Sequence, residues 1–318
     1  MTDTSNYPAT SPGDLKNLLD GLVPSSTRAG ILQALRASGV ITSPDSRVGV
    51  ALEQNVGSSL RINTNQTQAV VLGADTGTNI HSNGPLVIAT SGGNNYVDIS
   101  NYKPKSDHAD TVIGSSGSDY IYGNNAASLL KGGSGAETIQ SGGGQDTIVG
   151  GSGINTLIAG GRSDVFSGAG TAKVQAGLYG GSHDTVHAGT GQDTISLRRG
   201  NNTVYGPGKT GSATIVAGSG NDTIYGGAGS QTVTSGSPTE IHLGHGSTTL
   251  KLGNRANDTV FGSSNTGTLQ LNRASSDVAS THTVDGRTTI TFTGGACVTT
   301  VGDVNVAFTD HTRKSTTS

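Results

Sequence analysis

Apolar side chains recur at intervals of nine residues along the central part of the chain. From Gly114 to Gln270 the sequence divides into nine-residue units such as GGSGAETIQ and SGGGQDTIV, and two units, 177–187 and 206–216, are two residues longer. The eighth position is apolar in most units: Ile121, Leu130, Ile139, Ile148, Leu157, Phe166, Val186, Ile195, Val204, Ile215, Ile224, Val233, Val260 and Leu269. Where it is polar, the preceding residue is apolar, which predicts a local slip of one residue at Gln175, His242 and Lys251.

Each unit predicts one very short strand followed by a tight turn. One side chain per strand points inwards and its neighbours point outwards. The Gly-rich hexapeptides between strands suit turns, because Gly adopts positive φ angles and lets backbones approach closely. A single unit buries too little to be stable, so only stacked coils make a continuous core. We therefore expect an all-β fold, a parallel β-roll or β-solenoid, because a flexible Gly/Ser-rich linker has no reason to keep its apolar residues in phase.

The segments on either side of the repeats predict two caps. Residues 1–47 contain two helical stretches, DLKNLLDGL and SSTRAGILQALRASG, each with an apolar stripe, and form either a lid on the roll or a docking element. Residues 48–113 keep short apolar strands without the full motif and are expected to form irregular first coils. Residues 114–270 form the roll, and 271–318 a C-terminal β-cap with a hairpin in HTVDGRTTITFTGG and a frayed polar tail.

Composition excludes several protein classes. The chain has 318 residues, of which 51 are Gly, and only 31% are hydrophobic, too few for the thick core of an ordinary globular domain. It has 1 Cys, so no intramolecular disulfide forms, and no apolar run approaches the length of a membrane span. The near-neutral net charge of -3 argues against a nucleic-acid partner. The N-terminus lacks the basic and apolar regions of a cleavable secretion signal.

Several units resemble a known calcium-binding repeat. GGSGAETIQ, AGTGQDTIS and AGSGNDTIYGGAGS are similar to the pattern GGxGxDxUx, almost letter for letter, and this is the nonapeptide of the RTX, or hemolysin-type, repeat. The strict resemblance covers residues 114–270. It implies a parallel β-roll in which two nonapeptides make one coil and Ca²⁺ ions lie between successive turns. In that pattern the sixth-position Asp supplies a carboxylate, and the Gly-rich backbone supplies carbonyl oxygens.

The sixth positions of alternate units must then lie on opposite edges of the roll. One edge, which we call the carboxylate-rich edge, carries seven successive oxygen-bearing side chains: Asp146, Asp164, Asp184, Asn202, Asp222, Glu240 and Asp258. Asp110 and Ser128 precede them on the same edge. Because Ca²⁺ prefers hard oxygen ligands, we expect calcium to line this edge.

The opposite edge carries fewer carboxylates. We expect it to hold little calcium, apart from one ion at the first pair, Asp119 and Glu137. We expect the ammonium of Lys173 to replace an ion between Asn155 and Asp193. The alternative is that these Asp side chains only cap turns by accepting hydrogen bonds from backbone amides. Capping explains single turns, but it does not explain stacked carboxylates, which repel each other without a cation.

The sequence offers no set of residues for catalysis. None of its Glu residues follows a His, so there is no HExxH zinc-protease motif, and there is no GxSxG motif of a serine hydrolase. The His residues are scattered, and Cys297 is expected to be a small packed side chain. We therefore expect a protein that is not an enzyme.

Three roles remain open. The first is a rigid calcium-stabilised structural protein, displayed extracellularly in a surface assembly or on a virion as a decoration or fibre protein, with other protein subunits bound through its N-terminal helices. The second is an adhesin-like module that binds ice or polysaccharide through outward Thr rows. The third is an accessory or targeting module of a secreted enzyme. We expect export without a cleaved signal, by a type I-like route, or a place on a virion surface, with neither nucleic-acid binding nor membrane insertion.

Overall fold

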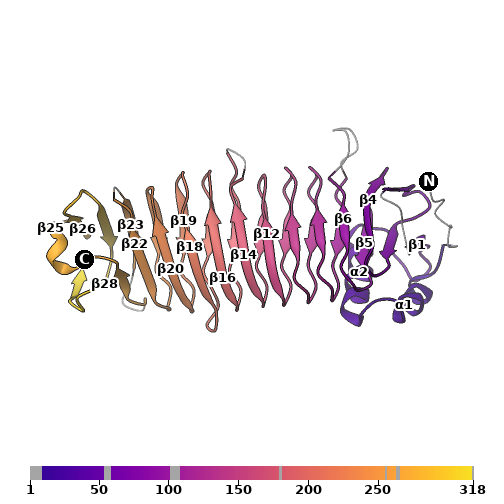
Figure 1. Ribbon diagram of the computed structural model, residues 1–318, viewed down its shortest axis with the longest axis horizontal. Helices are drawn as coiled ribbons and strands as arrows, with labels where there is room; N and C mark the ends of the chain where they lie inside the picture. Colours follow the sequence, from indigo (N-terminus) through magenta and orange to yellow (C-terminus); the bar gives the residue numbers. More distant parts are fainter. Residues whose placement is uncertain are drawn as a thin grey trace. The chain divides into compact units, whose positions relative to one another are not determined.

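The computed structural model describes residues 9–53, 59–100, 108–178, 181–254, 256–262 and 266–316. The chain divides into two compact units, an N-terminal unit, Met1–Ala159, and a C-terminal unit, Gly160–Ser318. Each unit is built from coils in which short strands alternate with turns (Figure 1).

Two parallel sheets share the coils of the N-terminal unit. Each coil gives one strand to each sheet, so neighbouring strands in a sheet come from successive coils. The first sheet consists of β1 (Val50–Glu53), β3 (Ala69–Leu72), β5 (Val87–Thr90), β7 (Thr111–Ile113), β9 (Leu129–Lys131) and β11 (Thr147–Val149). The second sheet consists of β2 (Ser59–Ile62), β4 (Gly77–Ser82), β6 (Tyr96–Asp98), β8 (Tyr120–Tyr122), β10 (Thr138–Gln140) and β12 (Ile154–Ile158).

The core of these coils is a stack of single apolar side chains. Ile121, Ile139 and Leu157 lie in register in the second sheet, and Leu130 and Ile148 in the first. All five are fully buried, at 0% exposure. Burial of one such side chain stabilises the fold by about 1.5–3 kcal/mol. The nine-residue pattern therefore predicted both the strands and their inward residues correctly.

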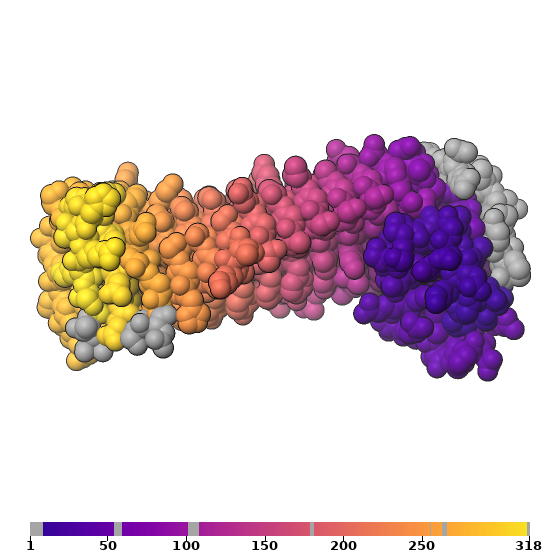
Figure 2. Space-filling model, turned by 90° about the horizontal axis from the view of Figure 1, so that it is seen from below, coloured from indigo at the N-terminus to yellow at the C-terminus, as the bar shows by residue number. Residues whose placement is uncertain are grey.

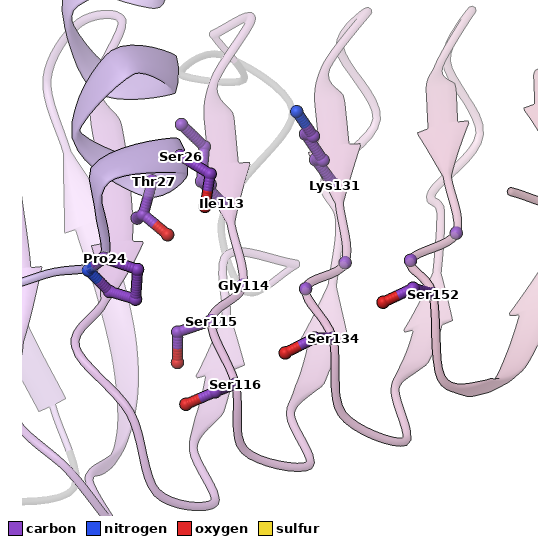
Figure 3. A pocket seen from close by; sticks show the side chains of 14 residues that line it. Pro24, Ser26, Thr27, Ile113, Gly114, Ser115, Ser116, Lys131, Ser134 and Ser152 are labelled. Carbon is purple, nitrogen blue, oxygen red and sulfur yellow. The ribbon is translucent and has the colours of Figure 1, made fainter. Parts of the chain in front are cut away.

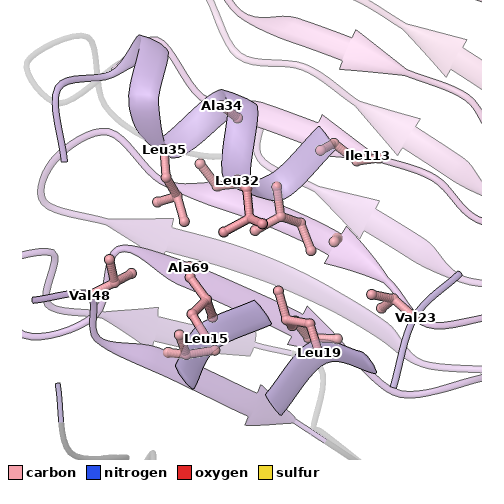
Figure 4. Close-up of a cluster of buried hydrophobic side chains, with 14 of the residues drawn as sticks. Leu15, Leu19, Val23, Leu32, Ala34, Leu35, Val48, Ala69 and Ile113 are labelled. Carbon is pink, nitrogen blue, oxygen red and sulfur yellow. The ribbon is translucent and has the colours of Figure 1, made fainter. Parts of the chain in front are cut away.

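Two helices cover the first coils of the N-terminal unit. They are α1 (Pro12–Asp20), whose first turn is capped by the Ser11 side chain, and α2 (Ser25–Ala37). Leu15, Leu19 and Leu35 are fully buried against a cluster that includes Ile113 of β7 (Figure 4). Figure 2 shows the indigo helical region lying on the purple coils of the same unit. The apolar stripes predicted for the helices therefore face the roll, as a lid requires.

The C-terminal unit repeats the two-sheet arrangement. Its first sheet contains β13 (Asp164–Phe166), β15 (Thr185–His187), β17 (Thr203–Tyr205), β19 (Asp222–Tyr225), β21 (Thr239–His242) and β23 (Asn257–Phe261). Its second sheet contains β14 (Thr171–Ala176), β16 (Gln192–Leu197), β18 (Ser212–Val216), β20 (Ser230–Ser235), β22 (Thr248–Leu252) and β24 (Leu269–Leu271). The strands within each of these two sets are parallel.

The inward residues of this unit include one that the sequence pattern assigned wrongly. The predicted slips are confirmed, because Val174, Ile241 and Leu250 are fully buried. The unit at residues 159–167 slips in the same way: Val165 is fully buried, whereas Phe166 is 39% exposed on the outer face. Two adjacent apolar residues left the frame ambiguous there, and the structure turns the smaller one inwards.

A β-cap completes the C-terminal unit. β27 (Cys297–Val301) joins the first sheet next to β23, and antiparallel pairing then adds β26 (Arg287–Phe292) and β25 (Val278–Val284), which follows a short 3₁₀ turn, Ser275–Asp277. Asp285 and Gly286 form the predicted two-residue hairpin, both with positive φ, at 49° and 71°. The second sheet ends in β28 (Val304–Ala307) and β29 (Arg313–Thr316), so the tail expected to fray pairs as an edge strand. No helix among the described residues is long and apolar enough to span a membrane.

Candidate metal centre

In each unit, the side chains that point inwards where the strands begin stack into two ladders, and most of them are polar. The first ladder borders the first sheet, with Asp110, Ser128 and Asp146 in the N-terminal unit, and Ser163, Asp184, Asn202, Asp222, Thr239 and Asp258 in the C-terminal unit. The second ladder borders the second sheet, with Asn95, Asp119, Glu137 and Asn155, and then Ala172, Asp193, Ala213, Gln231 and Thr248. All of these residues are buried. The first ladder corresponds to the predicted carboxylate-rich edge.

Hydrogen bonds to the backbone hold the ladder carboxylates in place. Asp146 Oδ1 accepts from the backbone N–H of Ser128 at 2.9 Å, one coil earlier. Asp222 does the same with Asn202 at 3.0 Å, and its Oδ2 accepts from Gly218 of its own turn at 3.1 Å. Turn capping, the alternative weighed from the sequence, is therefore a real part of what these side chains do.

Asp164 and Glu240 do not lie on the ladder. Asp164 is in register with Thr185, which leaves Ser163 on the rung beside Asp184. Glu240 is in register with Thr259, and Thr239 occupies the rung instead. Because successive side chains of a strand point to opposite faces, a slip of one residue moves a predicted ligand to the outer face. The prediction of seven successive oxygen ligands is wrong at these two positions, and the slip visible at Ile241 was the signal that could have corrected the second.

Lys173 also lies outside the roll. It is exposed and in register with Thr194, so Ala172 fills the rung. The backbone N–H of Ala172 donates to Asp193 Oδ1 at 3.1 Å. The prediction that the Lys173 ammonium replaces an ion is therefore wrong, for the same reason of register.

Carboxylates alternate with neutral side chains along the first ladder of the C-terminal unit. Asp184, Asp222 and Asp258 are separated by Asn202 and Thr239. With strands about 4.8 Å apart, carboxylates on alternate rungs lie roughly 10 Å from each other. The repulsion used above as an argument for a cation is therefore weak on this ladder.

Adjacent carboxylates do occur on the second ladder of the N-terminal unit. Asp119 and Glu137 occupy neighbouring rungs, and the Asp119 backbone N–H donates to Glu137 Oε2 at 2.9 Å. Burial raises the pKa of Glu137 to about 7, against the hydrogen bond from the Asp119 backbone, and the Asp119 carboxylate raises it further. This pair, predicted from the sequence to hold one ion, is the place where a cation relieves the most charge repulsion.

Three buried ladder oxygens find no hydrogen-bond partner among the described residues. They are Asp146 Oδ2 and Asn155 Oδ1 in the N-terminal unit and Asp258 Oδ2 in the C-terminal unit. Burial raises the pKa of Asp146 and that of Asp258 to about 6. An unsatisfied buried oxygen costs about 1–3 kcal/mol. A bound Ca²⁺, which takes oxygen ligands, would satisfy such atoms, so the donor set fits this metal.

The turns between the ladders stack closely, so that the Cα atoms of one turn lie next to the carbonyl oxygens of the turn one coil earlier. A Cβ added to Gly151 would overlap the carbonyl oxygen of Gly133, one coil earlier. Figure 3 shows Ser116, Ser134 and Ser152 in equivalent places of three successive turns, which line a cavity of about 280 Å³ beside the start of α2. Only Gly allows this spacing. It brings carbonyl oxygens, which are calcium ligands, to the same edge as the carboxylates.

The described residues contain no group of three or more His, Cys, Asp or Glu side chains gathered around one point. The ladder carboxylates instead accept hydrogen bonds from amide and hydroxyl side chains and from backbone N–H groups of the turns. A metal here would therefore be held mainly by single carboxylates together with turn carbonyls.

The RTX calcium-binding nonapeptide repeat matches the chain in four copies, at residues 106–136, 149–170, 179–206 and 207–237. A comparison with curated proteins finds no match. The family match confirms the resemblance drawn from the sequence and identifies these segments as calcium-binding repeats. It does not assign individual ligands, so the roles of Asp110, Asp184 and Asp222 as ligands stay predictions.

Proposed function

Because residues 106–237 carry RTX calcium-binding repeats, we propose that this chain is a non-catalytic structural protein whose β-roll is stabilised by Ca²⁺ outside the cell. RTX repeats are typical of secreted proteins, and extracellular modules bind calcium at the millimolar concentrations found there. The finer part of the proposal is display in a surface assembly or on a virion.

One observation carries this proposal. Three buried carboxyl groups with raised pKa values, Glu137, Asp146 and Asp258, lie on the inward ladders of the roll, and Asp146 and Asp258 each have an oxygen without a hydrogen-bond partner. In the N-terminal unit, Asp146 on the first ladder and Asp119, Glu137 and Asn155 on the second would hold the metal together with turn carbonyls. In the C-terminal unit, Asp222 and Asp258 would do so. The bound ion would supply positive charge where the fold otherwise buries negative charge or unsatisfied oxygen.

The N-terminal helices support the lid role more directly than a docking role. Their apolar stripes pack on the first coils, so only their polar faces are open to another molecule. Docking of other protein subunits onto these polar faces stays a prediction.

The test has two stages. Far-UV circular dichroism of the whole chain, with and without millimolar calcium, should show β-structure that melts at a higher temperature with calcium and not with magnesium. Immunogold labelling of the native source material should then place the protein on an outer surface. Equal melting with both metals would contradict the calcium role, and label confined to the cell interior would contradict surface display.

A second candidate function rests on a row of threonines. Thr194, Thr214, Thr232 and Thr249 lie in register on the outer face of the second sheet of the C-terminal unit, one per coil. Regularly spaced hydroxyl and methyl groups suit ice binding. Substitution of Thr214 by Lys should then abolish inhibition of ice recrystallisation, and a wild-type chain without such inhibition would exclude this function.

A further inference from the structure

A row of six aromatic rings crosses the outer face of the first sheet in the C-terminal unit. The row consists of Phe166, His187, Tyr205, Tyr225, His242 and Phe261, one from each successive strand from β13 to β23. Neighbouring ring centroids are 4.5 to 5.1 Å apart, and the ring planes lie within 20° of parallel. The His residues were treated above as scattered, because the row appears only when the coils are placed in register.

The stacking decides which part of the row can receive a ligand. Rings stacked face to face cover each other's faces, so the inner rings present only their edges to solvent. A sugar ring packs its apolar C–H face against the face of an aromatic ring, which the inner rings cannot offer. The row ends at Phe261, because Val301 lies opposite it in β27. The face of Phe261 that is turned away from His242 is therefore not covered by a further ring of the row.

A pocket of about 310 Å³ lies at this end of the row. Its lining includes Phe261, Thr223, Glu240, Thr259 and Arg287, the last from the hairpin of the cap. This volume is at the lower end of the range for small-molecule sites. The pocket therefore combines the aromatic ring of Phe261 with hydrogen-bonding groups of both polarities, since a carboxylate accepts, a guanidinium donates and hydroxyl groups do both.

Glu240 is held in place by its neighbour. His242 Nε2 lies 2.6 Å from Glu240 Oε1. A carboxylate only accepts hydrogen bonds, so the hydrogen is on the His nitrogen. The second oxygen, Oε2, can then accept from a ligand. The outward charged side chains of the lining, Glu240 and Arg287, have opposite charges, so the pocket carries no net charge that would select an anionic ligand.

We propose that this pocket binds a neutral linear oligosaccharide, with one sugar ring against the Phe261 ring and its hydroxyl groups bonded to Glu240 and Arg287. This site lies on the outside of the roll, away from the inward ladders, and goes beyond the structural role proposed above. The site is also distinct from the threonine row, because the pocket lies on the first sheet and the threonines lie on the second. The nine-residue pattern wrongly placed Glu240 on the inward ladder. Its outward position is what makes it available to a ligand at this site.

Isothermal titration calorimetry of the whole calcium-loaded chain tests the proposal. The probes are cellohexaose, xylohexaose, mannohexaose, maltohexaose and chitohexaose, with hexagalacturonate as the anionic comparison. At least one neutral hexasaccharide should bind, and hexagalacturonate should not. Phe261→Ala should weaken binding about tenfold or more, and Glu240→Gln, which keeps the shape of the side chain, should weaken it by a similar factor.

Phe166→Ala is the matched control, because Phe166 also ends the row and also stacks on a His, at the opposite end from the pocket. It should leave the affinity unchanged. The proposal is overturned if none of the five neutral probes binds, if only hexagalacturonate binds, or if Phe166→Ala and Phe261→Ala weaken binding equally. Circular dichroism of each variant in calcium shows whether it is folded, and Glu240→Gln decides the matter if Phe261→Ala does not fold.

Discussion

Removal of calcium should make the stability of this protein fall steeply as the pH rises from about 4 to about 7. The perturbation is simple: the whole chain is transferred to calcium-free buffer and its melting is followed across this pH range. The groups responsible are Glu137, Asp146 and Asp258, whose pKa values are about 7, about 6 and about 6. All three side chains are at most 1% exposed.

The sign follows from the direction of these shifts. A carboxyl group whose folded pKa lies above its unfolded value binds its proton more tightly in the folded state. Its contribution to stability is fully present below the unfolded pKa and is lost as the pH rises through the folded pKa. For Asp146 and Asp258 the loss is complete just above pH 6, and for Glu137 just above pH 7.

The magnitude follows from the size of the shifts. The pKa of Asp146 rises from 3.8 to about 6, and each pKa unit corresponds to about 1.4 kcal/mol, so ionisation of this group destabilises the calcium-free fold by at most about 3 kcal/mol, less whatever solvent screens. The rise from 4.5 to about 7 at Glu137 gives a similar figure. Domains are stable by only about 5–15 kcal/mol, so two such groups in the N-terminal unit remove a large part of its stability.

Thermal melting followed by far-UV circular dichroism measures this effect. In calcium-free buffer the Tm should fall between about pH 4 and pH 7 and then level off, and millimolar calcium should remove the fall by binding the ionised groups. Asp146→Asn should reduce the calcium-free fall, whereas the control Asp164→Asn, on the outer face, should not change it. A calcium-free Tm that stays level or rises with pH would refute the reasoning, as would equal effects of the two variants.

Three further predictions concern packing. Ile148→Ala should lower the free energy of unfolding by about 2–5 kcal/mol, whereas Ile154→Ala, at a side chain 72% exposed, should change it little, as urea denaturation measures. Gly246→Ala should lower the urea midpoint, because a Cβ there would overlap the Gly229 carbonyl oxygen, and Gly236→Ala, which meets open space, should not; equal midpoints would contradict close stacking of the turns. Leu19→Ala should loosen the helical lid and speed tryptic cleavage of α1 and α2 in the whole chain, and an unchanged cleavage rate would argue against the lid.

The sequence predicted those features that depend on one repeat at a time. Inward residues such as Ile148 and the hairpin at Asp285-Gly286 follow from local spacing and turn chemistry, and both are as expected. The nine-residue pattern assigned the wrong inward residue where two adjacent residues are both apolar, as at Val165 and Phe166. The choice there depends on which side chain fits a thin core, which only the neighbouring coils decide.

For the candidate site, too, the sequence predicted some residues and missed others. Buried carboxylates at Asp119, Glu137 and Asp146 were predicted from position six alone. The roles of Ser163 and Thr239 on the ladder were missed, because a shift of one residue changes the face of a strand without changing the motif. The aromatic row was missed for a related reason. His187, Tyr205, Tyr225 and Phe261 are the last residues of alternate units, but the slipped units place Phe166 and His242 at position eight, so the row becomes visible only when successive coils are aligned in register.

The alternation of charged and neutral rungs on the first ladder also limits how such a chain can lengthen or shorten during evolution. Loss of the single coil that contains Asn202 would preserve the apolar stack and the rings, yet it would bring Asp184 and Asp222 onto neighbouring rungs. Duplication or deletion of two coils together would preserve the charge pattern as well. Natural length variants of this protein should therefore differ by pairs of coils, a step of about four nonapeptides.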